Sequence, residues 1–586
     1  MCSTKIIKKD YIVAVGLAIF IWIIAASSLG FFNAGFDCML VYDGGDSLSV
    51  TAQVKELLQE NWVWNTNRMG APYGHEALAY PSVCLHIPEL LMMKFWGLFT
   101  DNVALVINLQ YLFTFSLCAA IAYFTLRKMG VGSLLAFLGG TIFSLNPYIY
   151  SRGISHFSLS ACYFIPLSIY LCYYCYFYND EVCQKNILIR KWINIIFMCL
   201  CIAINGIGYY PFFTCFLLGV TAVCIFFKTN SIKQRLLPVG MILTICVFMF
   251  IALIPSYIYK INAGIDNITS REVVELELYS LKISQLFMPI YTHGLSFVAN
   301  FRDEYNGNMP LVNENVSSYL GVVACVGFII GILYLLGLGK NTERDEDILF
   351  FSKLNMAAVI TMSVGGFISL INLSLHIYGL RGFNRISVYI SFCCISIICI
   401  LLQRYVFHST DGRIVFYEVK IISIILLIIF GIWEQTPQLT NSGEDLLENK
   451  KAWDDDEKFI KGIESQLSKG DMVYQMPYHI YPEGGTVNDM ADYQLLKGFV
   501  HSDTLRWSYG AFSGTEGDEW NKKVSQLPIE ERISAISSSG FKGIYIDGEA
   551  YTAQELEDLL LELERVLGES PIVSNDGKLF FFNLNN

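Results

Sequence analysis

Two carboxylates near the N-terminus have the spacing and setting for chemistry. Asp43 and Asp46 lie in the turn Val41-Tyr-Asp-Gly-Gly-Asp-Ser-Leu, shortly after a long apolar stretch. A carboxylate held at such a turn can act as a general base on a hydroxyl group or hold a metal ion. Asp and Gly also favour turns for their own conformational reasons, so a purely structural role stays open at this point.

Basic residues next to other apolar stretches suggest an anion site. Arg152 and His156 follow Asn146-Pro147, and Arg381 and Arg385 lie four residues apart in Leu380-Arg-Gly-Phe-Asn-Arg-Ile-Ser. The planar guanidinium fork suits phosphate oxygens. The alternative is that these side chains reach along the apolar surface towards lipid headgroups.

Aromatic residues beside carboxylates occur near the C-terminus. Trp507 and Tyr509 lie in Arg506-Trp-Ser-Tyr-Gly, close in sequence to Asp503 and Asp518. Such a set suits a sugar ring, which stacks on an aromatic face and hydrogen-bonds to carboxylates. The same residues equally suit the core of a small domain. The acidic residues of the loop 260–317 are interpreted as a solvated helix surface.

Several functional classes lack their motifs. The sequence has no Walker loop, no G-x-G-x-x-G, no H-E-x-x-H and no paired C-x-x-C, which disfavours ATP-driven transport. None of the 17 cysteines follows Cys399, and most lie within apolar runs, where Cys behaves as a small hydrophobic residue. Cys38 and Cys84 flank the first long loop and can pair if it faces an oxidising compartment.

The composition places these residues in a membrane protein. Hydrophobic residues make up 54% of the chain and charged residues only 16%, against about 25% in soluble domains. A membrane-spanning helix needs about 20 mainly apolar residues. About eleven stretches fit that length, and they lie near 11–32, 102–126, 131–150, 157–178, 192–209, 211–227, 236–258, 318–338, 354–378, 386–407 and 418–433. The interrupted apolar stretch Leu85–Leu98 is predicted as a re-entrant or interfacial helix.

Lys and Arg are denser in alternate connections, starting with Lys5, Lys8 and Lys9 at the N-terminus. The positive-inside rule therefore predicts a cytoplasmic N-terminus and an outer C-terminal part, in the plasma membrane. We expect a membrane domain over 1–433, with a first outer loop at 33–101 that holds the candidate active site and a second long outer loop at 260–317. Residues 434–586 form the expected extracytoplasmic domain.

The C-terminal part is acidic and has a mixed pattern. From Glu434 onwards there are 28 Asp/Glu and 13 Lys/Arg, a net charge of −15, while the rest of the chain is at +3, which together give the −12 of the whole. This charge argues against nucleic acid as a partner. The periodicity predicts a small α/β domain, with helices near 452–468, 528–539 and 552–567 and strands at Met472–Met476, Gly543–Ile546 and Leu579–Phe582.

Taken in order along the chain, several segments resemble the GT-C superfamily of membrane glycosyltransferases, particularly its bacterial cell-envelope members. These segments are Gly45-Asp46, Asn67-Arg-Met-Gly-Ala-Pro-Tyr-Gly, Arg152 with His156, Ser318-Tyr-Leu-Gly, Arg381-Gly-Phe-Asn-Arg-Ile-Ser, Leu505-Arg-Trp-Ser-Tyr-Gly and Gly540-Phe-Lys-Gly-Ile-Tyr-Ile-Asp. The resemblance spans nearly the whole chain, and the order of the segments carries it more than any one of them does.

The resemblance implies a polytopic bundle that takes a sugar from a polyprenyl-phosphate-linked donor and transfers it to a glycan, polymer or lipid of the cell envelope. The bilayer and these two substrates are the implied partners, with no cofactor and no metal. Asp46 is the implied base, with Asp43 as its competitor and Asp37 as a further alternative. The other implied site residues are Arg385, Arg381, Arg152 and His156 at the donor phosphate, and Arg68, Trp507 and Tyr509 at the acceptor.

Two other functions compete with this hypothesis. A transporter or flippase of lipid-linked sugars would share the bundle and the phosphate-binding arginines, but it would not need a carboxylate at the outer surface. An inverted repeat, which such proteins often carry, is not visible in the sequence. A non-catalytic envelope-assembly factor would use the C-terminal domain as a binding module.

Overall fold

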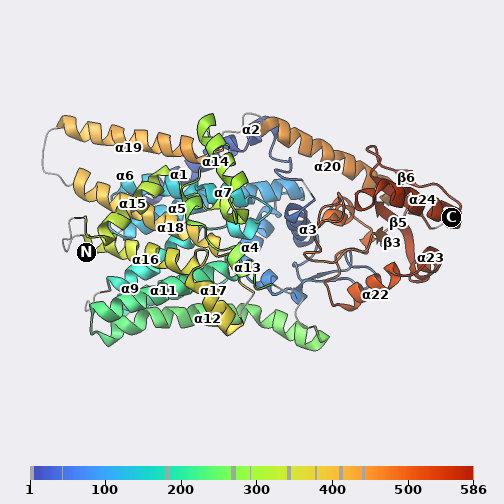
Figure 1. Cartoon of the computed structure of the whole chain (residues 1–586), viewed down its shortest axis with the longest axis horizontal. Helices are drawn as coiled ribbons and strands as arrows, with labels where there is room; N and C mark the ends of the chain where they lie inside the picture. The colour runs from blue at the N-terminus through green and yellow to red at the C-terminus, as the bar shows by residue number, and fades with distance from the viewer. Residues whose placement is uncertain are drawn as a thin grey trace.

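The computed structural model describes residues 6–42, 44–178, 185–265, 272–290, 292–339, 345–376, 379–407, 414–437 and 442–584. Its elements form a helical bundle with an α/β part at one end (Figure 1). The described N-terminal residues lie at the end of the bundle away from the sheet, and the C-terminus lies at the far end of the α/β part. The two parts are joined by helices and loops that pack against both.

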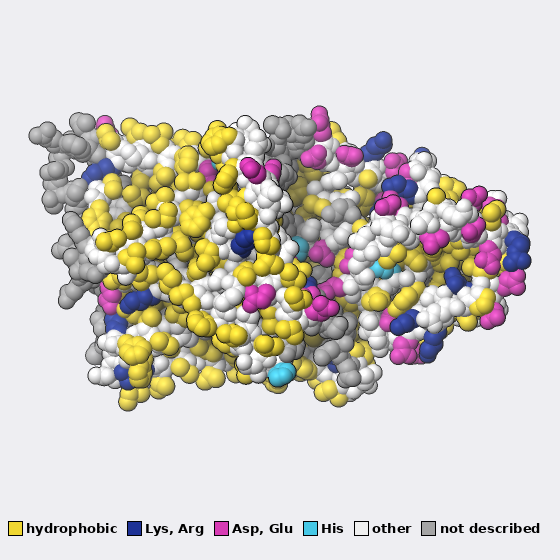
Figure 2. All heavy atoms as spheres, in the orientation of Figure 1, with side chains coloured by type: hydrophobic (Ala, Val, Ile, Leu, Met, Phe, Trp, Pro, Cys, Tyr) yellow, Lys and Arg dark blue, Asp and Glu magenta, His cyan; other side chains and the backbone are white. Residues whose placement is uncertain are grey.

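Long helices make up the bundle. Five of those among the described residues are long and apolar enough to cross a membrane: Lys8–Ser28 (α1), Val103–Lys128 (α5), Gly206–Lys228 (which contains α11, Tyr209–Lys228), Ile232–Ala263 (α12) and Phe383–Val406 (which contains α18, Ser387–Leu401). Hydrophobic side chains cover the bundle surface in Figure 2, whereas charged side chains gather over the α/β part. So much exposed apolar surface would be unfavourable in water. The chain is therefore a polytopic membrane protein.

The remaining predicted spans also coincide with helices, some of them shorter or broken. These helices are α6 (Ser133–Ser144), α8 (Phe157–Ser160), α9 (Ile165–Tyr176), α10 (Lys185–Ala203), α15 (Val322–Leu335), α16 (Glu346–Met362), α17 (Phe367–Leu375) and α19 (Ile414–Gln435). The predicted span 157–178 is broken before Pro166, and the span 354–378 is broken at 363–366. The number of membrane crossings therefore stays a prediction.

The first outer loop is compact and mostly ordered into short elements. It contains α2 (Phe31–Ala34), α3 (Asp46–Gln59), the two-stranded pair β1 (Asn65–Thr66) and β2 (His75–Glu76), and α4 (Ile87–Trp96). α4 forms within the stretch Leu85–Leu98, where an interfacial helix was predicted. Cys38 and Cys84 are both buried free thiols, so the possible disulfide is not formed.

Short elements also occupy the predicted second outer loop and the end of the bundle next to the α/β part. They are α7 (Pro147–Arg152), α13 (Glu275–Leu278), α14 (Ser296–Asn308) and the 3-10 turns Asn313–Ser317 and Phe383–Ile386. α7 lies beside the turn Asn313–Ser317, which brings together segments that are far apart in the sequence.

The α/β part is built on a five-stranded sheet in the order β4-β3-β5-β7-β6. Its strands are β3 (Met472–Met476), β4 (Arg506–Trp507), β5 (Phe541–Asp547), β6 (Ile572–Val573) and β7 (Leu579–Asn583). β3 pairs in parallel with β4 and β5, while β7 is antiparallel to β5 and β6. The three predicted strands are confirmed.

Helices accompany this sheet: α20 (Ser442–Glu464), α21 (Lys497–His501), α22 (Glu516–Ser525), α23 (Ile529–Ser538) and α24 (Ala553–Leu567). All three predicted helices are present, and α21 and α22 were not predicted. α20 connects the sheet to the last helix of the bundle (Figure 1). The placement of a domain boundary at residue 434 stays a prediction.

Candidate functional site

The first outer loop is fastened to the α/β part by backbone hydrogen bonds. The Trp507 amide donates to the Arg68 carbonyl at 2.8 Å, and the amides of Gly70 and Ala71 donate to the carbonyls of Tyr509 and Trp507, both at 2.9 Å. Ala71 is fully buried in the hydrophobic core of the α/β part. A loop near the N-terminus and a strand near the C-terminus therefore form one structural unit.

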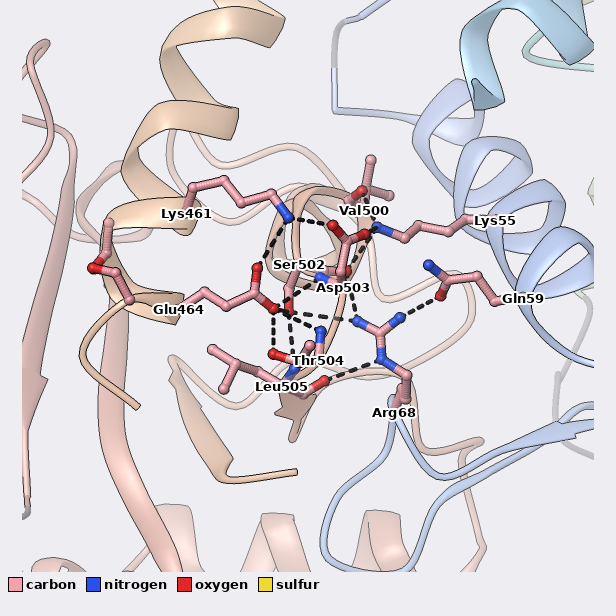
Figure 3. Close-up of polar contacts among 12 residues, drawn as sticks. Lys55, Gln59, Arg68, Lys461, Glu464, Val500, Ser502, Asp503, Thr504 and Leu505 are labelled. Carbon is pink, nitrogen blue, oxygen red and sulfur yellow. Dashed lines mark hydrogen bonds and ion pairs between the residues drawn. The ribbon is translucent and has the colours of Figure 1, made fainter. Parts of the chain in front are cut away.

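Side chains from α3 and from the loop that follows it strengthen this contact (Figure 3). The Lys55 ammonium is buried and donates to the carbonyls of Val500 and Ser502 at 2.8 and 2.7 Å. The Arg68 guanidinium donates to the carbonyls of Ser502 and Leu505 at 2.6 and 3.3 Å, and it lies over the Phe499 ring. These bonds fix the position of α3 and of the loop after it relative to the sheet, and the predicted role of Arg68 in acceptor binding stays a prediction.

The turn before α3 is held equally closely. The Tyr493 amide donates to the Gly44 carbonyl at 3.1 Å. Gly44 has a φ of +78°, and a Cβ added there would lie 3.0 Å from the Cβ of Ala491. Glycine is needed at this position because the backbone is left-handed and the approach is close. Asp43, the second candidate base, lies outside the described residues.

One face of α3 carries a polar stripe that lines a cavity of about 230 Å³. Asp46, Ser49, Gln53 and Glu56 follow one another at helical spacing along this face. The other walls come from the loop 75–86, from residues 155–159 beside the bundle, and from 481–493 and Phe512 of the α/β part. Sequence reasoning selected Asp46 but missed the other three, although their spacing of three or four residues was the signal for one helix face.

At the bundle end of this cavity, Asp46 faces His156. The Asp46 Oδ2 and His156 Nε2 atoms are 3.6 Å apart, and both side chains are partly accessible. Burial, followed by the positive charge of Arg152, lowers the pKa of His156 to about 4. A neutral imidazole therefore stands beside the candidate base at neutral pH.

Next to His156, two arginines converge on one carboxylate. Arg152 Nη1 is 2.7 Å from Glu314 Oε2, and Arg385 Nη2 is 3.2 Å from the same oxygen. Although burial opposes ionisation, the two guanidinium groups lower the pKa of Glu314 to about 2. Glu314 was not singled out from the sequence because its partners are more than 70 residues away.

Both arginines keep hydrogen-bonding capacity that the protein does not use. Arg152 and Arg385 are 3% and 6% exposed. Nε and Nη2 of Arg152 and Nε of Arg385 are buried and have no hydrogen-bond partner. Buried donors normally have partners, so unpaired guanidinium N–H groups indicate a place for a further acceptor. Arg385 also lies over the Tyr209 ring, 4.1 Å from its centroid.

Arg381 does not join this cluster. Its Nη1 atom is 2.6 Å from Glu275 Oε1, and its guanidinium lies over the Tyr279 ring. The predicted group of phosphate-binding residues thus divides into Arg152, Arg385 and His156, which are brought together, and Arg381, which is paired with another element.

The predicted acceptor residues of the α/β part are placed in its interior. Trp507 is 1% exposed and lies edge-on to Tyr545, with ring centroids 5.7 Å apart. Tyr509 is buried, and its hydroxyl donates to the Asp492 carbonyl at 3.2 Å. Both rings are thus packed in the interior of the α/β part, which is the alternative that the sequence left open. Their assignment to acceptor binding stays a prediction.

The floor of the cavity holds ionisable groups that are uncharged at neutral pH. Glu56 is 1% exposed, and burial raises its pKa to about 8. Burial lowers the pKa of both His75 and His86 to about 4. No group of three or more His, Cys, Asp or Glu residues in the described ranges is arranged to hold a metal ion. Whether the protein depends on a metal stays a prediction.

These features define a polytopic membrane protein with a polar cavity between its bundle and an α/β part. Residues 13–364 match a family model described as a domain of unknown function (DUF6311), and the chain belongs to this family. No curated protein sequence matches the chain.

Among solved structures, the chain is similar to the archaeal oligosaccharyltransferase AglB from Archaeoglobus fulgidus, determined in complex with an inhibitory peptide and a dolichol-phosphate. The identity is 11% and the TM-score 0.48, over 99% of this chain and 74% of the other.

Proposed function

We propose that this protein is a membrane glycosyltransferase that moves a sugar from a polyprenyl-phosphate-linked donor to a glycan, polymer or lipid of the cell envelope. The observation that carries the proposal is the meeting of Asp46 and His156 with the Arg152–Glu314–Arg385 cluster. His156, next to the candidate base, is close enough to both arginines to feel their charge. The base and the phosphate-type donors are therefore near one another at the end of an apolar bundle, where a lipid-linked substrate has its headgroup.

Each residue has a defined part in the proposed reaction. Asp46 takes the proton of an acceptor hydroxyl, whose oxygen forms a bond to the anomeric carbon of the donor sugar. The bond between that carbon and the phosphate oxygen breaks, and the polyprenyl phosphate leaves with the electron pair. The free N–H groups of Arg152 and Arg385 stabilise the negative charge that develops on the phosphate.

Glu314 and His156 adjust the charge of this site. Glu314 cancels one of the two guanidinium charges, so the empty cluster carries a net charge of +1 instead of +2. A moderate positive charge attracts a phosphate and also lets the product phosphate leave. The neutral His156 lies 3.6 Å from Asp46 and does not neutralise its charge.

The test uses cells that lack this protein, because the sugar and the acceptor need not be known in advance. Their envelope glycans should lack one sugar substituent, which the wild-type gene restores. Asp46→Asn keeps the size of the side chain but removes the proton acceptor, and general-base catalysis contributes about 10² to 10⁴ in rate. We therefore expect this variant to be inserted normally and to transfer sugar at least roughly a hundredfold more slowly.

Asp43→Asn serves as the internal control. If Asp43 only shapes the turn, its substitution has a mild effect; if it is the base, the two outcomes exchange. Unchanged envelope glycans in the deletion strain, or full complementation by both variants, would refute the proposal. If the protein were instead a flippase, both variants would move lipid-linked sugar as the wild type does.

A further inference from the structure

The deep end of the α3 cavity contains a carboxyl group that the proposed reaction does not use. Glu56 lies ten residues after Asp46 on the same helix, which separates them by about 15 Å at 1.5 Å per residue. Its Oε1 atom is buried and has no hydrogen-bond partner. Its Oε2 atom is 3.9 Å from His75 Nε2, which is too long for a hydrogen bond.

The protonation states of Glu56 and His75 are complementary. His75 Nδ1 is 2.7 Å from the Gly510 carbonyl, which can only accept, so Nδ1 carries the hydrogen. Because His75 is neutral, its Nε2 atom is left as an acceptor. Glu56, with its pKa of about 8, keeps its proton at neutral pH and is a donor. One donor and one acceptor thus face the same space without satisfying each other.

The remaining walls restrict the kind of ligand. Aromatic rings of Tyr80, Tyr481 and Phe512 stand around this end, with the Tyr481 and Phe512 centroids 5.0 Å apart. No Lys or Arg is among the described residues that line the cavity, whereas Asp46 and Glu483 do line it. Such walls repel anions, so this cavity is chemically distinct from the arginine cluster beside it.

We infer that the cavity binds an uncharged, hydroxyl-rich ligand, a neutral sugar unit, with one hydroxyl group bridging the Glu56 carboxyl group and His75 Nε2. A hydroxyl group both accepts and donates, so it satisfies both partners at once. That this sugar is the acceptor rests on the proposed function, since the same cavity ends at Asp46. The binding itself does not depend on transfer.

The experiment measures binding of methyl glycosides to the full-length protein by saturation-transfer difference NMR. The protein is held in lipid nanodiscs, because many detergents carry sugar headgroups. The probes are the methyl glycosides of glucose, galactose, mannose and N-acetylglucosamine, with methyl glucuronide as the charged counterpart. We expect at least one neutral glycoside to bind and the glucuronide to bind about tenfold more weakly.

Variants of Glu56 locate the site. Glu56→Ala should weaken binding about tenfold, the effect of one lost hydrogen bond to a buried group. Glu56→Gln should retain glycoside binding, because the amide still donates a hydrogen bond. Glu519→Gln, on the exposed face of α22, is the matched control and should behave as wild type. If Glu56→Ala fails to fold, the pH dependence decides: wild-type binding should decline above about pH 8 as Glu56 ionises, while Glu56→Gln binding persists.

Binding of no neutral glycoside to the wild type, equal binding of the glucuronide, or an unchanged affinity in a folded Glu56→Ala variant would overturn the inference. The proposed function fails separately. Glycoside binding with normal transfer by Asp46→Asn would remove Asp46 from the mechanism but keep the sugar site. Transfer that depends on Asp46, without any glycoside binding, would keep Asp46 in the mechanism but remove the sugar site.

Discussion

Arg152, Glu314 and Arg385 form a buried set of charges in which one carboxylate serves two guanidinium groups. Glu314 alone cannot use all of their N–H groups, and three of their nitrogen atoms have no partner in the interior. Leaving buried donors unpaired costs free energy, which a bound phosphate would recover. The arrangement is therefore expected to matter more for ligand binding than for stability.

Replacement of Arg385 tests this expectation. Arg385→Ala should raise the donor concentration needed for half-maximal transfer by at least about tenfold, since a charge-assisted hydrogen bond contributes about 1.5–3 kcal/mol. Arg385→Lys should recover only part of the lost donor binding, because an ammonium group cannot make the forked contact. Transfer is measured in membranes containing equal amounts of protein.

Arg381→Ala is the matched control, because Arg381 lies in the same segment but pairs with Glu275. We expect it to change donor use by less than Arg385→Ala does. Equal effects of the two substitutions would contradict the division of the arginines into a ligand-binding pair and a structural one.

Glu56 should make stability depend on pH. In the folded protein its pKa is about 8, against an ordinary value of 4.5, so the folded state holds a proton that the unfolded state has lost. Stability must therefore fall as pH rises through this interval, by roughly 2 kcal/mol between pH 6 and 8. The difference in melting temperature between wild type and Glu56→Gln, measured across this range, isolates the effect from other groups. A constant difference would show that Glu56 is not buried in its protonated form.

Among the elements, α3 depends most on tertiary contacts. Its polar stripe faces a cavity, its Lys55 binds carbonyl groups of the α/β part, and the loop that follows it pairs with the chain around β4. An isolated helix of this length is marginal in water. The position of Asp46 is thus set by the C-terminal residues as much as by its own turn.

Gly70→Ala should disturb this arrangement. Gly70 has a φ of +67°, and a Cβ there would lie 2.3 Å from the Gly74 carbonyl oxygen, a backbone atom that cannot move easily. We expect a loss of stability of more than about 2 kcal/mol, because steric overlap adds to the conformational strain. Thermal unfolding of the purified protein measures it.

The control is Gly470→Ala, which has a similar φ of +88° but no atom within 4 Å of the added Cβ. It should cost only the conformational strain, about 1–2 kcal/mol. If the two variants were equally stable, the close approach at Gly70 would not be important for joining the loop to the sheet.

For the whole molecule, the prediction concerns orientation. The described N-terminal residues and the sheet lie at opposite ends of the bundle, and the distribution of Lys and Arg predicts that the sheet end is outside. The α/β part has no cysteine, so Ser570→Cys at its exposed surface is a specific probe. It should react with an impermeant thiol reagent in intact cells, after Cys38 and Cys84 have been replaced to lower the background.

Asn230→Cys, in a connection predicted to be inside, is the control and should react only after lysis. The opposite pattern would place the α3 cavity in the cytoplasm. An envelope acceptor and an outward-facing donor would then be incompatible with the site.

The sequence by itself determined the membrane class, the positions of most helices and the three main strands. Apolar runs and periodicity are local properties that the bilayer and the backbone hydrogen bonds impose directly. Asp46, Arg152, His156 and Arg385 could also be selected as candidates, because charged or polar residues at the ends of apolar stretches are uncommon.

Only the tertiary structure decided which of these residues lie together. Glu314 pairs with Arg152 across 162 residues, and Trp507 is buried because the first loop and the sheet pack around it. Glu56 faces a cavity whose other walls come from the bundle and from the α/β part. A pairing between distant segments depends on the free energy of packing the whole chain, so it leaves no local pattern that the sequence alone could reveal.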